Sequence, residues 1–499
     1  MSSTALKNGQ NYNTAKMWQI GFFALNNTAT NLYMFILTFV SYYAAGIAGL
    51  TVAVVSIVLT AMRIFDGITD PIVGFIIDKT ESKFGKFRPM MILGNVLLAS
   101  SVILMYTITH NLPLSLQLLF FVLTYALYVI GYTFQTAVTK AAQTVLTNDP
   151  KQRPMFAVFD GIYNTGVFTV GQVYVASYLI GKHGDFTMGL FAELNTLAII
   201  LAGIFTILAV IGIAGKDRKE FYGLADLTVN TKFRDYWKIF KANRPLQFLI
   251  TAVTADKLAF SLLRQSVVVV MIFGILMGDY ELSGTVSMIT VIPILLITFL
   301  AVAIARKRGM RSSFIQSTWV AFLSLAGLAA LFLVISDPVS MSDSIGIGLV
   351  VFVILYTLAM GFGAIPSTLV NPMIADVSDY ETFKSGRYVP GMIGTLFSFV
   401  DKLVTSLAPA IVGLGVALIG FTDEFPTVND SLTTSLFGMT LLLGFGIPAL
   451  LLSVSLLSMK FYKLDDKKME EIQEDLAKMK AEGKVDEEGT ETKTKNEAI

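Results

Sequence analysis

The chain has 499 residues, of which 54% are hydrophobic and 15% are charged, and its formal net charge at pH 7 is +1. A soluble protein of this composition would lack the polar side chains needed to cover its surface, so an ordinary water-soluble fold is excluded and a lipid bilayer is the expected environment. The lack of cysteine also excludes a disulfide framework and thiolate chemistry. The charge balance indicates no particular partner, and we expect no nucleic-acid partner.

Apolar windows of about twenty residues, the length that crosses a bilayer, recur along almost the whole chain. The N-terminus MSSTALKNGQNYNTAKMWQ is too polar for a signal peptide, so we expect the first window to remain as a membrane span. The windows predict about twelve spanning helices and an all-α integral membrane fold. Their predicted ranges are 17–44, 49–77, 88–108, 114–147, 154–182, 187–215, 246–277, 283–305, 312–336, 343–373, 388–420 and 432–462.

Positive charges in the loops alternate between the two sides of the predicted membrane. In the loops that join each odd span to the next even span, Lys182 is the only Lys or Arg. Basic residues gather near the cytoplasmic ends of spans, so this asymmetry predicts a multi-pass protein of the cell membrane with both termini in the cytoplasm. The basic loops contain Lys79, Lys83, Lys86 and Arg88 after the second span, Lys151 and Arg153 after the fourth, and Arg306, Lys307, Arg308 and Arg311 after the eighth.

Two charged stretches lie outside the spans. The stretch 216–244 predicts a cytoplasmic linker between an N-terminal six-helix bundle, 1–215, and a C-terminal six-helix bundle, 245–462. A weak internal repeat supports this division, because DKTESKFGKFR after the second span resembles ARKRGMR after the eighth. The charged cytoplasmic tail, 463–499, predicts a polar helix followed by disorder, and we expect it to be solvated rather than functional.

Ionisable residues inside the apolar windows are the most informative, because a charge at membrane depth is costly and is usually paired or exposed to an internal cavity. In the second span, Arg63, Asp66 and Asp70 follow the spacing i, i+3 and i+7, which places them on one helix face. Two carboxylates one turn apart can bind a hard cation or exchange a proton. The alternative is a structural Arg–Asp pair that holds neighbouring helices together.

The fourth span carries a polar stripe that is unusual for a lipid-facing helix, and it predicts that this helix faces a cavity. Hydrogen bonding between helices is the alternative for its Thr and Gln residues. Lys140 fits that alternative only if a carboxylate such as Asp66 or Asp70 neutralises it. The stripe consists of Tyr132, Thr133, Gln135, Thr136, Lys140 and Gln143.

Three further spans contain polar groups with two interpretations. Asn26 belongs to a set of hydrogen-bonding residues in the first span that suit a hydroxyl-rich solute, although helix packing is the commoner role for any single one of them. The dipeptide Asp-Lys occurs in the seventh span, as Asp256–Lys257, and in the eleventh, as Asp401–Lys402. Each dipeptide is either a paired charge or part of a transport pathway.

The sequence lacks the common motifs of soluble enzymes. It has two histidines, no phosphate-binding glycine-rich loop and no zinc-ligand spacing. We therefore expect no enzymatic activity and no ATP-driven transport by this chain alone.

Two separate motifs resemble one known family. The segment RIFDGITDP, followed by the basic loop SKFGKFRP, resembles the glycoside-pentoside-hexuronide:cation symporters of the major facilitator superfamily, typified by melibiose permease. After the tenth span, ADVSDYETFKSGR is similar to a cytoplasmic loop pattern of the same family. The matching positions are Asp376, Asp379, Tyr380, Lys384 and Gly386.

The resemblance implies the major facilitator fold, with two six-helix bundles around a central cavity that opens to either side in turn. It also implies that Asp66 and Asp70 are paired cation-site carboxylates, with Thr133 as a third contributor. Lys402 matches a lysine near the cation site of the family, on its eleventh helix. Other positions depart from the pattern, since Asn26 and Thr136 stand where the family has sugar-site aspartates.

A third departure is Lys140, which stands where the family has a sugar-stacking tryptophan. These changes make a galactoside a poor expectation. A cationic side chain near the site favours an anionic sugar such as a uronide, or neutralises the carboxylates and weakens the cation dependence.

The function expected from these features is symport of a sugar or glycoside with Na+ or H+, with no other cofactor. The expected ion site is Asp66, Asp70 and Thr133, and the expected solute site is Asn26, Tyr132, Thr136, Lys140 and Lys402. The expected gating residues of the cytoplasmic loops are Lys83, Lys86, Arg88, Asp376, Asp379, Tyr380 and Lys384. The alternatives are an uncoupled facilitator or exchanger and, from another class, a sensor or scaffold that signals through its tail.

Overall fold

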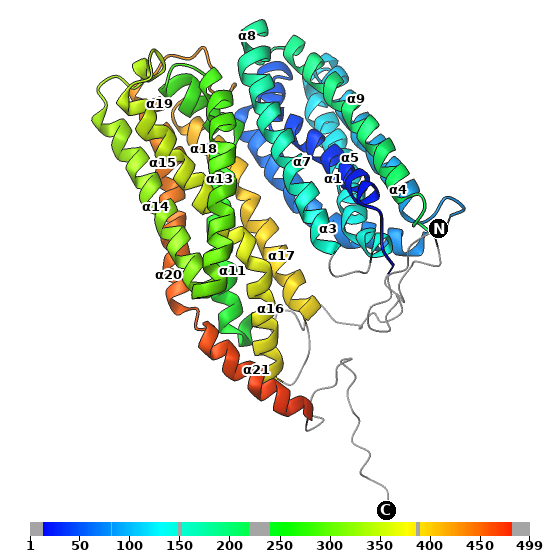
Figure 1. Ribbon diagram of the computed structural model, residues 1–499. Helices are drawn as coiled ribbons and strands as arrows, with labels where there is room; N and C mark the ends of the chain where they lie inside the picture. Colours follow the sequence, from blue (N-terminus) through cyan, green and yellow to red (C-terminus); the bar gives the residue numbers. More distant parts are fainter. Residues whose placement is uncertain (1–12, 81, 148–151, 219–239, 386–389, 482–499) are drawn as a thin grey trace, which may run out of the picture. The chain divides into compact units, whose positions relative to one another are not determined.

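The computed structural model describes residues 13–80, 82–147, 152–218, 240–385 and 390–481 (Figure 1). These residues form helices joined by short connections, and no strand occurs among them. The helices of the first half are α1 Met17–Leu37, α2 Val40–Tyr42, η1 Tyr43–Ile47, α3 Val52–Lys79, α4 Phe87–Ile108, η2 Thr109–Asn111, α5 Leu114–Ala141, α6 Gln143–Leu146, α7 Arg153–Val173, η3 Tyr174–Leu179, α8 Ile180–His183 and α9 Met188–Ile213.

The second half continues the same architecture and adds a final helix beyond the predicted spans. Its helices are α11 Arg244–Leu263, α12 Ser266–Val269, η5 Val270–Leu276, α13 Glu281–Arg308, α14 Met310–Val334, η6 Val339–Ser342, α15 Ile347–Gly363, α16 Ile365–Ser385, α17 Pro390–Thr405, α18 Leu407–Leu418, α19 Thr434–Leu441, η7 Leu442–Gly446, α20 Ile447–Phe461 and α21 Asp466–Ala481.

Helices occupy all twelve predicted windows, so the all-α, multi-span prediction is confirmed. In the described part of the chain, eleven helical segments are long and apolar enough to cross a membrane. The window 154–182 is helical but is not among these eleven, and α7 carries the polar residues Asp160, Asn164 and Gln172. The helix α13 shows why a bilayer is needed, because Ile292, Leu296 and Phe299 on its surface are each more than half exposed.

Several spans are broken at residues that suit a helix end. The tenth is divided into α15 and α16 after Gly363, where an added Cβ would come within 1.8 Å of the Phe260 ring. At the start of α11, Asn243 accepts a hydrogen bond from the Leu246 N–H at 2.9 Å, and Pro245 occupies the first turn. Such caps satisfy N–H groups that have no partner inside the helix.

The described residues belong to two compact units. The first consists of Met1–Val229, Gln265–Val291 and Pro409–Met439, and the second of Asn230–Arg264, Ile292–Ala408 and Thr440–Ile499. In the first unit, α1 packs against α9, α7 and α5, and α5 also packs against α3 and α4. The second unit is centred on α11, which packs against α20, α17 and α16.

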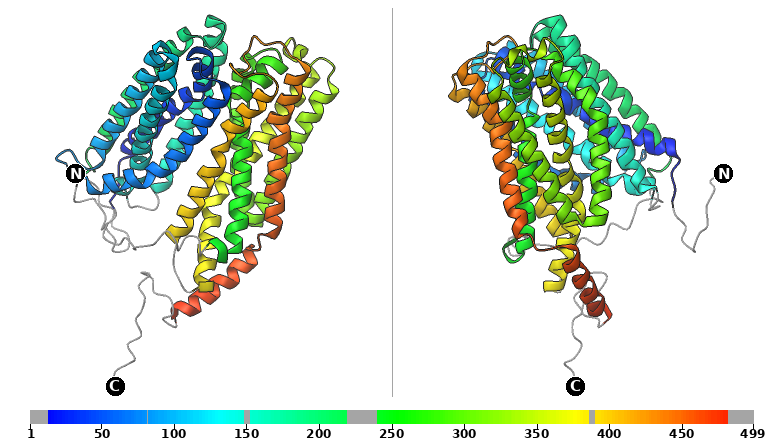
Figure 2. Two further views of the ribbon diagram at one scale, coloured as in Figure 1. Left: turned by 180° about the vertical axis from the view of Figure 1, so that it is seen from behind. Right: turned by 60° about the vertical axis from the view of Figure 1, so that its left-hand side comes forward.

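The helix predicted for the tail is present as α21, but it is not solvated all round. One face packs against α16, where Ile472 is 1% exposed and Leu476 is 7% exposed. Within the second unit, α21 lies across the ends of α20 and α16 (Figures 1 and 2). The tail therefore contributes to the apolar core of this unit, which corrects the expectation of a purely solvated segment.

Candidate functional site

The predicted ion-site residues Asp66 and Thr133 lie together where α3 packs against α5. The Thr133 hydroxyl is 3.2 Å from Asp66 Oδ1, and it is also 2.9 Å from the hydroxyl of Thr69. Asp66 and Asp70 are both half-buried, one turn apart on α3. The structure thus gathers carboxylate and hydroxyl oxygens, the ligands that hard cations prefer, inside an apolar span.

The polar stripe of α5 is divided between two faces of the helix. Tyr132 and Thr136 are half-buried and Lys140 is exposed, and their spacing of four residues places them on one face. Thr133, Gln135 and Thr139 are buried. They form hydrogen bonds between helices, which was the alternative interpretation of the stripe. Of the residues in this stripe, those predicted to bind solute are therefore the ones that remain accessible.

Asn26 is fully buried at the contact between α1 and α5. Its side-chain amide donates to the Gln135 carbonyl oxygen at 3.2 Å and to Thr139 Oγ1 at 2.8 Å. Its own carbonyl oxygen, Oδ1, has no hydrogen-bond partner in the described part of the chain. These contacts hold two helices together, and binding of solute by Asn26 stays a prediction.

The two Asp-Lys dipeptides combine into one ion pair in the second unit. Lys257 Nζ of α11 lies 2.7 Å from Asp401 Oδ2 of α17, and both side chains remain about a fifth to a quarter exposed, at 26% and 19%. Asp256 is instead buried, 1% exposed, on a different side of α11. Lys402 is half-buried next to this pair, and its association with solute or ion stays a prediction.

The basic loop after the second span is held by an aspartate that sequence reasoning missed. Asp217 follows α9, and its buried carboxylate accepts hydrogen bonds from the backbone N–H groups of Lys86, Phe87 and Arg88 at 2.9, 3.0 and 2.9 Å. Arg88 Nε adds an ion pair to Asp217 at 3.4 Å. Carboxylates at the N-terminus of a helix are favoured by its free N–H groups and its dipole.

Of the predicted gating residues in this loop, Lys86 and Arg88 therefore reach a defined contact, whereas the Lys83 side chain is exposed. The sequence contained a hint of this contact, since the short charged segment GKD follows the sixth span and the basic segment FGKFR follows the second. Nothing in either segment alone indicates that Asp217 contacts the start of the third span.

The loop motif after the tenth span lies on α16 and connects it to two other segments. Asp379 accepts a hydrogen bond from Gln473 of α21 at 2.6 Å, and Lys384 donates to the Ala242 carbonyl oxygen at 2.6 Å. In the same motif Glu381 accepts from Asn243, which caps α11, at 2.9 Å. Asp376 and Tyr380 are half-buried on the same helix; Gly386 lies outside the described residues.

At the predicted outer ends of the spans, the first unit contains tightly packed aromatic and polar contacts. The rings of Tyr42 and Phe186 stack at 4.1 Å between centroids, and the Tyr42 hydroxyl donates to the Pro426 carbonyl oxygen at 2.9 Å. Gln172 of α7 donates to the hydroxyl of Tyr280 at 3.2 Å. Within this unit, α2 therefore contacts the segment 409–439, and α7 contacts the segment 265–291.

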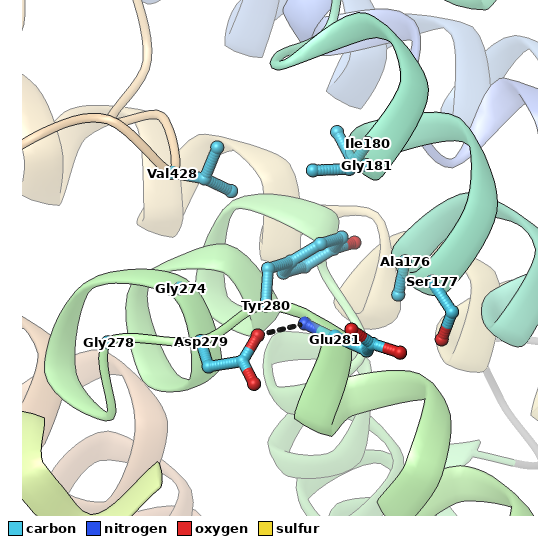
Figure 3. A pocket seen from close by; sticks show the side chains of 10 residues that line it. All are labelled: Ala176, Ser177, Ile180, Gly181, Gly274, Gly278, Asp279, Tyr280, Glu281 and Val428. Atoms are coloured by element: carbon cyan, nitrogen blue, oxygen red, sulfur yellow. Dashed lines mark hydrogen bonds between the residues drawn. The ribbon is translucent and has the colours of Figure 1, made fainter. Parts of the chain in front are cut away.

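A small cavity of about 200 Å³ lies beside these contacts (Figure 3). Its wall includes Asp279, Tyr280 and Glu281, with the Glu281 N–H donating to Asp279 Oδ1 at 2.8 Å. Burial raises the pKa of Tyr280 to about 12, so its hydroxyl stays protonated at neutral pH. Pockets that enclose a small organic ligand usually measure about 300 to 1,000 Å³, so this cavity is too small to be the solute site.

Comparison with known proteins adds independent observations. The uncharacterized symporter YjmB of Bacillus subtilis (strain 168) is 26% identical over 448 residues, covering 87% of this chain and 89% of that protein. The putative glycoside/cation symporter YagG of Escherichia coli (strain K12) is 22% identical over 447 residues, covering 88% and 90%. The solved structure of the nucleoside transporter NupG has a TM-score of 0.60 at 13% identity, covering 90% of this chain and 99% of that one.

The likeness to the solved structure shows that the two proteins share a fold. The family model described as MFS/sugar transport protein matches residues 22–466. This range includes all twelve predicted spans apart from the start of the first, so the resemblance that the sequence motifs carried is confirmed. The chain belongs to the MFS/sugar transport protein family.

Proposed function

We propose that the protein is a secondary active transporter that couples uptake of a sugar or glycoside to Na+ or H+ across the cell membrane, with both termini in the cytoplasm. The observation that supports this most is the contact between Asp66 and Thr133, half-buried within two apolar spans. Acidic side chains at membrane depth are costly, and they commonly mark ion pathways. The names of the related symporters point to the same activity.

In this proposal the ion site and the solute site share the helix α5. A cation at Asp66 and Asp70 neutralises carboxylates that would otherwise be charged within the membrane, while Tyr132 and Thr136 offer hydroxyl groups to the solute. Coupling requires only that ion and solute bind the same conformation better together than apart, and this effect is reciprocal. The chain itself supplies the oxygen ligands, and Na+ or H+ supplies the driving gradient.

The solute is proposed to be anionic, because Lys140 is exposed on the face of α5 that also carries Tyr132 and Thr136. A lysine within a membrane span that faces a polar cavity can bind a carboxylate through a charge-assisted hydrogen bond. Lys402 is proposed as a second cationic group for the same solute. A uronide fits this chemistry better than a neutral glycoside.

The test is uptake of radiolabelled sugars, glycosides and uronides into proteoliposomes, with Na+ and pH gradients imposed separately. Wild type should accumulate one solute class under one gradient, and the double variant Asp66→Asn with Asp70→Asn should exchange solute without accumulating it. Asp343→Asn, which changes an exposed loop residue, is the matched control and should behave as wild type.

The rival function is an uncoupled facilitator or exchanger, in which the bond between Asp66 and Thr133 is purely structural. That function predicts solute equilibration without accumulation under either gradient, in wild type as well as in the double variant. Such a result would overturn the symport proposal.

A further inference from the structure

The second unit contains a carboxyl group that the proposed transport site does not use. Asp256 of α11 is 1% exposed, within a helix that packs against α20, and α20 packs in turn against α14 (Figure 1). A charge pair was one of the two interpretations of the Asp256–Lys257 dipeptide. In the structure Lys257 pairs with Asp401 of α17.

Two hydroxyl groups from other helices surround the Asp256 carboxyl. Thr318 Oγ1 of α14 lies 3.3 Å from Asp256 Oδ2, and Ser455 of α20 lies close to the same carboxyl. Both hydroxyl-bearing side chains are buried, with Ser455 at 0% and Thr318 at 1% exposed. In the described part of the chain, neither Asp256 Oδ1 nor the Ser455 hydroxyl has a hydrogen-bond partner.

The hydrogen bonds around Thr318 leave the Asp256 carboxyl short of donors. A hydroxyl has one hydrogen, and the Phe314 carbonyl oxygen accepts from Thr318 Oγ1 at 3.0 Å. Thr318 can donate its single hydrogen to Asp256 Oδ2 or to the Phe314 carbonyl oxygen, but not fully to both. Asp256 Oδ1 has no hydrogen-bond partner among the described residues, so the carboxyl lacks the set of donors that stabilises a buried carboxylate.

Among the described residues, no cation is paired with Asp256. The charged or titratable groups on α11 and on the helices around it include Lys257, Tyr356, Asp376, Asp401, Lys402 and Lys460, with Arg264 and Arg311 at the nearest helix ends. None of these groups forms a hydrogen bond or ion pair with the Asp256 carboxyl. A buried carboxylate without a cation is strongly disfavoured and is neutralised instead.

We propose that Asp256, with Thr318 and Ser455, is a proton-binding site in the second unit, separate from the ion site at Asp66 and Asp70. A proton suits it better than a metal ion, because Ca2+ and Mg2+ bind about six or more oxygen ligands and three side chains contribute oxygens here. Release of the proton leaves an unpaired negative charge between α11, α14 and α20. We therefore expect these helices to pack tightly only while Asp256 is protonated.

The test is infrared difference spectroscopy of the full-length protein in proteoliposomes without solute, in H2O and D2O, across a pH titration. Wild type should show the C=O stretch of a protonated carboxyl at pH 7, shifted in D2O. Asp256→Asn should lose this band while keeping the side-chain shape. Asp66→Asn with Asp70→Asn and Asp343→Asn should retain it.

A second variant keeps the test decisive if Asp256→Asn fails to fold. Thr318→Val preserves the shape of the side chain but removes the hydroxyl that hydrogen-bonds to Asp256, so the Asp256 band should move to higher frequency. The proposal is overturned if wild type and Asp256→Asn give the same spectrum at pH 7, or if the band titrates near pH 4, where exposed aspartates do. Loss of the band when Na+ is added at constant pH would identify a metal-cation site and overturn it as well.

Discussion

At the scale of single residues, the exposed lysine of α5 is the strongest candidate for setting solute charge. Lys140 lies about one turn from Thr136 and two turns from Tyr132 on one helix face, and its side chain is exposed. A hydrogen bond to a charged partner contributes about 1.5–3 kcal/mol, so its loss changes affinity roughly tenfold or more. Lys140→Ala should therefore weaken uptake of a uronide by about that factor while leaving neutral sugars unaffected.

The check is competition between labelled uronide and unlabelled neutral sugar in proteoliposomes. Lys140→Arg retains the positive charge and should keep most of the preference. Equal selectivity and unchanged ion dependence in wild type and Lys140→Ala would remove Lys140 from both the solute site and the ion site.

Helical spacing predicted shared faces better than it predicted contacts between helices. The spacing of Asp66 and Asp70 predicted a shared face, and the resemblance predicted Thr133 as a third contributor; the structure adds Thr69, whose hydroxyl lies 2.9 Å from that of Thr133. The stripe on α5 could have been divided by helical periodicity, because Tyr132, Thr136 and Lys140 repeat every four residues. The burial of Asn26 depends on how α1 meets α5, which no local pattern reveals.

At the scale of elements, both loops of the weak internal repeat pass a glycine close to an aspartate. Gly85, with φ 94°, would place a Cβ 2.2 Å from Asp217, and Gly309, with φ 86°, would place one 2.4 Å from Asp466. Asp217 follows the sixth span and Asp466 follows the twelfth. The sequence showed the repeated loops after the second and eighth spans. It did not show that each loop contacts an aspartate four spans further along the chain.

This close approach predicts that Gly85 tolerates no side chain. Gly85→Ala combines a clash with a positive φ, and strained backbone of this kind costs about 1–3 kcal/mol. The variant should unfold at a lower temperature than wild type in detergent, measured by tryptophan fluorescence. Gly74→Ala, where an added Cβ meets nothing within 4 Å, is the control and should leave the unfolding temperature unchanged.

The helix α21 predicts a second effect at this scale. Ile472 is buried against α16, next to the bond between Gln473 and Asp379. Ile472→Asp buries a charge without a partner and should release α21, so amide hydrogen exchange in residues 466–481 should become faster. Glu470→Gln on the exposed side of the helix should not change it. Fast exchange already present in wild type would show that α21 is not held by this contact.

At the scale of the whole molecule, hydropathy predicted the all-α, multi-span fold class, because the bilayer imposes helix length directly. The breaks within spans could not be predicted in the same way. The tenth span is divided after Gly363, where the Phe260 ring leaves no room for a side chain, and these two residues are about a hundred positions apart in the chain. The aromatic contacts around Tyr42 also join distant segments, and periodicity carries no information on them.

Contacts between these distant segments predict a way to block transport. Asn429 Nδ2 lies 2.9 Å from Asp185 Oδ2 at the predicted outer ends of the spans. A transporter that alternates must separate such contacts in each cycle. Because the natural chain has no cysteine, Asp185→Cys with Asn429→Cys creates the only thiols, and a short cleavable dithiol-reactive linker can join them.

Cross-linking this pair should abolish solute uptake into proteoliposomes, and cleavage of the linker should restore it. Each single cysteine variant, treated with the same reagent, should transport at its untreated rate, since one thiol cannot bridge the two segments. Full transport in the cross-linked pair, with cross-linking verified by mass spectrometry, would mean that Asp185 and Asn429 remain together throughout the cycle and that the outer path opens elsewhere.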